Sequence, residues 1–152
     1  MKNKKFFMLA LLWMAMIFYM SNQPSHISSA QSGGVIAMLS DVPIVGNIIE
    51  KMIELDIAQF IIRKAAHLSA FCILAILIFM SFYDDIKKIN IVAFKSMVFT
   101  FLYACTDEFH QFFIPGRSSE FRDVIIDSTG GFIGIIIVCT IIKLANKKYK
   151  TK

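Results

Sequence analysis

The sequence predicts an all-α membrane protein, a bundle of about four transmembrane helices with a further amphipathic helix at the outer surface. Of its 152 residues, 57% are hydrophobic and only 18% are charged, which leaves too little polar surface to cover a soluble domain of this length. Four long apolar segments follow one another, and lysines flank them at alternate connections. A bilayer must therefore solvate much of the surface.

The apolar segments cover residues 6–20, 57–83, 91–113 and 121–145. The last three reach the roughly 20 residues that a spanning helix needs. The first is shorter, and it is either a retained anchor, which its bulky Phe, Trp and Met side chains favour, or a signal peptide cleaved near Ser28 to Ala30. Residues 1–5 then form a cytoplasmic N-terminus, residues 6–145 the transmembrane domain and residues 146–152 a basic cytoplasmic tail.

The lysines predict the orientation in the cell membrane. Most of them lie before the first segment, at or near the connection between the second and third, and at or beyond the end of the fourth, at positions 2, 4, 5, 87, 88, 95, 143, 147, 148, 150 and 152. Because positive residues favour the cytoplasmic side, both termini are expected inside, with connections 21–56 and 114–120 outside. The net charge of +5 thus indicates topology rather than nucleic-acid binding, since no basic face carries aromatic residues.

Part of the long outer connection has the periodicity of an amphipathic helix. Apolar residues recur at helical spacing and charged residues fall between them, the former being Val45, Ile48, Ile49, Met52, Ile53 and Phe60 and the latter Glu50, Lys51, Glu54 and Asp56. Two interpretations stand. The favoured one is a separate helix at the outer surface, and the other is a partly exposed start to the second spanning helix.

Polar residues gather at the outer ends of the segments. The candidate catalytic residues are His67, Asp107 and Glu108, and the candidate ligand-binding residues are Gln23, Arg63, Lys64, His110, Gln111, Arg117, Arg122, Asp123 and Asp127. A charged residue at the bilayer centre costs about 2.5–3.5 kcal/mol on insertion scales, so these charges are expected to neutralise one another. They form either a salt-bridge network that joins the helices or a functional pocket, which the two histidines and the amide favour.

Two groups have a specific chemical interpretation. His67 is expected to pair with Glu108 or Asp107 across the bundle, because a carboxylate orients an imidazole for acid–base work. Arg117 follows Pro115 and Gly116, which suit a tight turn, so its guanidinium could bind a phosphate or carboxylate or pair with Glu120. The sequence defines no cofactor.

The ordered motifs resemble those of the VanZ-like family. They are Ser21-Asn22-Gln23, Arg63-Lys64-Ala65-Ala66-His67, Asp107-Glu108-Phe109-His110-Gln111, Phe113-Ile114-Pro115-Gly116-Arg117, then Asp123, Asp127 and the glycines at 130, 131 and 134. The resemblance implies a four-span bacterial envelope protein, and some members of the family lower sensitivity to teicoplanin and related lipoglycopeptides. Ser69 and Ala70 stand where the family often carries Glu or Tyr, and Ser128 where it often carries Asn.

Three functions follow as expectations. The first is binding of an outer-leaflet amphiphile, either a membrane lipid or a lipoglycopeptide, in a polar pocket on the extracytoplasmic face. The second is an enzyme acting on a phosphorylated or esterified lipid-linked envelope precursor, with a divalent metal held by His67, His110, Asp107 and Asp127 as a variant. Transport is disfavoured, because the inner halves of the segments lack the polar groups of a through-path.

Overall fold

The computed structural model describes residues 3–117 and 120–150, and every regular element within these ranges is helical. The elements are α1 (Lys4–Ser21), α2 (Ser25–Ser40), α3 (Val45–Glu54), α4 (Ala58–Phe82), the short 3-10 helix η1 (Ile86–Lys88), α5 (Ile89–Gln111) and α6 (Phe121–Lys150). The predicted all-α fold class is confirmed. Helices α1, α4, α5 and α6 are long and apolar enough to cross a membrane, so the chain is a multi-pass membrane protein.

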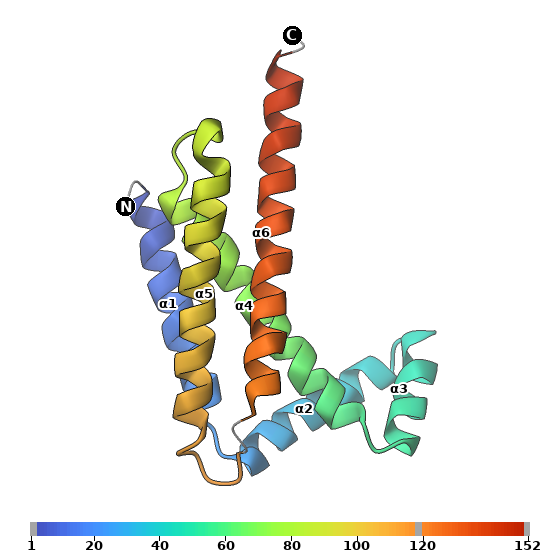
Figure 1. The fold of residues 1–152 in the computed structure, drawn as a ribbon. Coiled ribbons are helices and arrows are strands. Elements are labelled where there is room, and N and C mark those ends of the chain that lie inside the picture. The colour runs from blue at the N-terminus through green and yellow to red at the C-terminus, as the bar shows by residue number, and fades with distance from the viewer. Residues whose placement is uncertain (1–2, 118–119, 151–152) are drawn as a thin grey trace.

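The four long helices form one bundle around α4. In Figure 1 the axes of α1, α5 and α6 are roughly parallel, with α6 running opposite to the other two, and α4 crosses obliquely among them. Helix α4 contacts the other three, and its Phe71, Leu74, Ala75 and Phe79 are fully buried. Large apolar side chains such as Phe94 remain exposed on the outer surface, where lipid tails can solvate them.

Glycine residues set the distance between α4 and α6. A Cβ atom added at Gly130 would collide with the carbonyl oxygen of Leu68, and one at Gly134 would collide with that of Cys72. Backbones can approach this closely only where side chains are missing. The close approach also brings Asp127, which lies one turn before Gly130 and Gly131, against the first half of α4.

The start of α1 and the end of α6 lie at the same end of the bundle, and α2 and α3 lie at the opposite end (Figure 1). We name this opposite end, where α1 and α5 finish and α4 and α6 begin, the polar end. An even number of spanning helices produces this arrangement. The η1 connection, which contains Lys87 and Lys88, lies at the end of the bundle where α1 begins and α6 ends.

Helix α2 was not expected, because residues 25–34 have the Ser and Gly content of a loop. The helix tolerates its serines because they bond to its own backbone: Ser32 Oγ donates to Ser28 O at 3.0 Å, and Ser40 Oγ donates to Ile36 O at 2.9 Å. Ser28 and Ser32 are buried, and α2 packs on α4 and α3. Tertiary packing, not local apolar periodicity, therefore stabilises this helix.

Helix α3 is separate from α4, as the favoured interpretation predicted. Asp56, between the two helices, adopts a left-handed backbone with φ of 54°, a conformation that Asp tolerates better than most residues. Ile49 is buried, while Ile48 and Ile53 are exposed. An amphipathic helix with exposed apolar residues suits the surface of a bilayer.

Candidate functional site

Buried polar side chains are concentrated at the polar end. Ser21 on α1, Asp107, Glu108 and Gln111 on α5, and Asp127 on α6 are each at most 4% exposed. Carboxylates are rarely this buried unless they have partners. Their hydrogen bonds and ion pairs therefore show how the site is built.

Asp107 is held in a fixed orientation from two sides. Its Oδ2 accepts a hydrogen bond of 2.9 Å from Ser21 Oγ and another of 2.9 Å from Gln111 Nε2. The other oxygen, Oδ1, is buried and has no hydrogen-bond partner among the described residues. One carboxylate oxygen is thus anchored, and the other is left for a further interaction.

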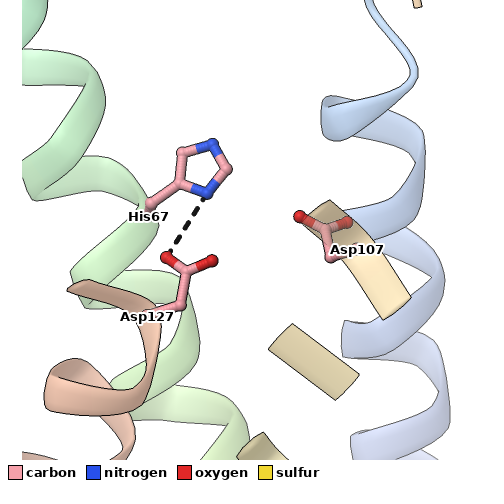
Figure 2. Close-up of side chains that lie close together, drawn as sticks. All are labelled: His67, Asp107 and Asp127. Atoms are coloured by element: carbon pink, nitrogen blue, oxygen red, sulfur yellow. Dashed lines mark ion pairs between the residues drawn. The ribbon is translucent and has the colours of Figure 1, made fainter. Parts of the chain in front are cut away.

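His67 pairs with Asp127, a residue from α6 rather than from α5. The imidazole Nδ1 lies 3.5 Å from Asp127 Oδ1. In Figure 2 the two side chains face each other, and Asp107 lies across from them on α5. One ligand atom from each of the three residues lies within 4.8 Å of the other two. We name His67, Asp107 and Asp127 the central cluster.

Glu108 is directed to the start of α6 instead of to His67. Its Oε1 accepts a hydrogen bond of 2.6 Å from the backbone N–H of Glu120. A carboxylate near a helix N-terminus satisfies a donor that the helix itself cannot use. Close by, Lys64 on α4 forms an ion pair with Asp123 on α6. These two interactions join α6 to its neighbours.

Arg117 ties the loop between α5 and α6 to the end of α1. Its guanidinium donates to Gln23 O at 3.2 Å, to Gln111 Oε1 at 3.2 Å and to Met20 O at 3.4 Å. Burial, followed by the positive charge of nearby Arg63, lowers the pKa of the Arg117 guanidinium from its ordinary value. Arginine nevertheless remains charged at physiological pH, so this loop carries a permanent, half-buried positive charge.

The turn before Arg117 has the geometry that its sequence suggests. Gly116 has a φ of 74°, which favours glycine, and an added Cβ would collide with the Ser25 side chain. The carbonyl of Pro115 accepts a hydrogen bond of 3.4 Å from the backbone N–H of Ser25. The first turn of α2 is thereby fixed against the loop.

Three of the predicted residues lie apart from the central cluster or act differently. His110 is hydrogen-bonded to Asn22 Oδ1 at 3.2 Å and stacks on Phe18. Arg122 pairs with Glu120 at 2.8 Å on the exposed surface. Gln23 contributes its backbone carbonyl to Arg117, while its side chain bonds to the backbone of its own helix.

A pocket of about 370 Å³ lies between α1, α2 and α4 and extends to the polar end. Its walls are mainly apolar. The charged side chains among the described residues that line it are Arg63 and Arg117, the His67 ring borders it, and no carboxylate lines it. Arg63 is half-buried and makes no hydrogen bond or ion pair with another described residue.

Several pocket residues were not anticipated from the sequence. Trp13 lines the pocket and donates through Nε1 to Ala70 O at 2.9 Å, and Ser28 and Ser32 supply polar atoms from α2. For Trp13 the sequence did offer a signal, because it is the single Trp and lies within a short apolar segment. No local pattern marks the serines, because their role depends on α2 docking against α4.

These features define a class, a polytopic helical membrane protein in which two buried aspartates and a half-buried histidine cluster at one end of the bundle. The model of the VanZ/LLP1 family matches residues 6–143. The chain therefore belongs to the VanZ-like family, as its motifs indicated. No curated protein and no solved structure matches it.

Proposed function

We propose that this VanZ-like protein binds an anionic amphiphile at the extracytoplasmic face of the bacterial cell membrane and so reduces susceptibility to teicoplanin or related lipoglycopeptides. The observation that carries the proposal is the charge of the pocket. An apolar cavity with two arginines and no carboxylate fits a hydrocarbon chain joined to a phosphate or carboxylate head group.

The geometry supports different roles for the two arginines of the pocket. Arg117 is already fixed by hydrogen bonds, so it supplies positive potential, while the unpaired Arg63 is free to bind the head group directly. Apolar residues from α1 and α4, including Trp13, Ile17 and Ile73, line the rest of the pocket and suit an alkyl chain. Ser69 and Ala70, which depart from the usual family residues, also line the pocket, so ligand choice can differ among relatives.

Trp13 provides a direct test, because it is the single tryptophan of the chain and lines the pocket. The purified full chain is titrated with an amphiphile whose acyl chain carries bromine, a contact quencher of tryptophan fluorescence. Three amphiphiles with the same brominated acyl chain are compared, one with a phosphate head group, one with a carboxylate and one with an uncharged glyceryl ester. We expect saturable quenching by the two anionic compounds at lower concentration than by the neutral one.

Two variants sharpen this test. Arg63→Gln should weaken the anionic compounds about tenfold or more, the equivalent of losing one charge-assisted hydrogen bond. Lys88→Gln removes the same charge at the opposite end of the bundle, where Lys88 makes an exposed pair with Asp84, and should leave quenching unchanged. Equal affinity for anionic and neutral compounds, or for Arg63→Gln and the wild type, would reject the proposal.

An enzymatic function is the second candidate, and the pair of His67 and Asp127 favours it. Asp127 lies beside Nδ1 of an imidazole that borders the pocket, an arrangement suited to general acid–base chemistry on a phosphorylated or esterified lipid precursor. Its test is incubation of the purified protein with lipid-linked phosphates and esters, with several divalent metals, followed by product analysis. Unchanged substrates under all conditions would exclude this function.

A further inference from the structure

The central cluster combines three ligand types from three helices. His67 lies on α4, Asp107 on α5 and Asp127 on α6, and their ligand atoms lie within 4.8 Å of one another. Figure 2 shows the imidazole and the two carboxylates turned toward a common space. In a tetrahedral site with metal–ligand bonds of about 2.0–2.2 Å the ligand atoms lie about 3.3–3.6 Å apart, so the atoms of this cluster would have to approach one another by about 1.2–1.5 Å at most to hold an ion.

The carboxylates of the cluster have unused acceptor capacity. Asp127 is 1% exposed, and neither of its oxygens has a hydrogen-bond partner among the described residues. Asp107 is 2% exposed, and its Oδ1 also lacks such a partner. Buried acceptors of this kind are costly unless something binds them. A ligand with positive charge is therefore expected between the two aspartates.

The surroundings of Asp107 add an independent indication. Ser21 and Gln111 both donate to Oδ2, and Oδ1 stays buried without a hydrogen-bond partner among the described residues. Metal-binding carboxylates are commonly oriented in this way by hydrogen bonds from outside the first coordination sphere. A neutral imidazole and two carboxylates also balance the charge of one divalent cation, which favours burial.

We propose that His67, Asp107 and Asp127 bind one divalent transition-metal ion, of the class of Zn²⁺ or Mn²⁺. One nitrogen and two carboxylate ligands suit these ions better than Mg²⁺ or Ca²⁺, which prefer oxygen ligands alone. His110 is not a ligand, because it pairs with Asn22 outside the cluster. The proposal depends only on these three side chains and not on what the pocket binds.

The test measures metal binding by the purified full chain in lipid nanodiscs, without any amphiphile. The protein is stripped with a chelator, and Zn²⁺, Mn²⁺ and Mg²⁺ are titrated in competition with a chromogenic chelator. We expect about one Zn²⁺ or Mn²⁺ per chain, with Mg²⁺ much weaker. His67→Gln and Asp127→Asn should weaken binding at least about tenfold, whereas His110→Gln and Asp123→Asn, matched residues outside the cluster, should not.

The wild type keeps the proposal testable even where a variant fails to fold. A bound ion should raise the thermal midpoint of the stripped wild-type protein, and Co²⁺ should give visible absorption bands of a nitrogen and oxygen site. No bound metal in the wild type would overturn the proposal, as would equal affinity in folded Asp127→Asn. Since no amphiphile is present, such a failure leaves the pocket proposal standing.

Discussion

Gln111 Nε2 donates a hydrogen bond of 2.9 Å to Asp107 Oδ2, one turn earlier on α5. The same amide accepts a hydrogen bond of 3.2 Å from Arg117 through its Oε1. One side chain therefore connects a pocket arginine with a carboxylate of the central cluster. The loop after α5, the pocket and the cluster share this support, so changes in the loop should affect all three.

Arg117→Ala should lower the stability of the whole polar end. Hydrogen bonds to two backbone carbonyls at the end of α1 and to Gln111 on α5 are lost, and losing a charged donor typically costs about 1.5–3 kcal/mol. Thermal unfolding in detergent measures the effect. Arg122→Ala is the control, because an exposed ion pair contributes about 0–1 kcal/mol. Equal effects of the two substitutions would contradict the role assigned to Arg117.

Gly134→Ala should destabilise the bundle, because its Cβ would collide with the carbonyl oxygen of Cys72 on α4. Overpacking of this kind costs about 1–3 kcal/mol. Gly33→Ala is a matched control on α2, where an added Cβ meets nothing within 4 Å. It should be neutral or stabilise the helix by up to about 1 kcal/mol. A tolerated Gly134→Ala would show that α6 does not need this close approach to α4.

Ala66→Phe should fill the pocket without disturbing the fold, because Ala66 is an exposed residue of α4 that lines the cavity. Ala65→Phe is the matched control, since the neighbouring Ala65 is also exposed but does not line the pocket. Both variants are expressed in a susceptible Gram-positive host at equal membrane abundance, and inhibitory concentrations of teicoplanin and vancomycin are compared. We expect the wild type and Ala65→Phe to protect selectively against teicoplanin and Ala66→Phe to lose that protection.

Equal protection against both antibiotics would contradict binding of the lipid chain. If the wild type gives no protection, lipoglycopeptides are removed from the proposed ligands of the pocket, and envelope lipids remain. Retained protection in Ala66→Phe would separate the resistance from the pocket.

The orientation in the membrane is testable with single cysteines. The native cysteines at 72, 105 and 139 are replaced by alanine, and His26→Cys or Lys148→Cys is added, both at exposed positions. The lysine distribution predicts that α2 faces outward and the C-terminal end of α6 faces inward. A membrane-impermeant maleimide should therefore label His26→Cys in intact cells and Lys148→Cys only after lysis. The reverse pattern would move the polar end to the cytoplasm.

The helices of the site illustrate what a sequence can and cannot predict. The pairs on one helix follow from spacing. His67 was expected to pair with Glu108 or Asp107; its ion pair is with Asp127, while Asp107 completes the cluster within 4.8 Å. Spacing places residues on a face and does not say which helix packs against that face. Gly130 and Gly134 decide this, because they allow α6 to approach α4.

The sequence by itself determined the all-α class, the four apolar helices and the family, because hydropathy, lysine placement and short motifs are local properties of the chain. The tertiary structure alone decided the position of α2, the charge of the pocket and the central cluster. These depend on contacts between residues far apart in sequence, such as Asp107 with Ser21. Such contacts form only when close helix packing outweighs the cost of burying polar groups.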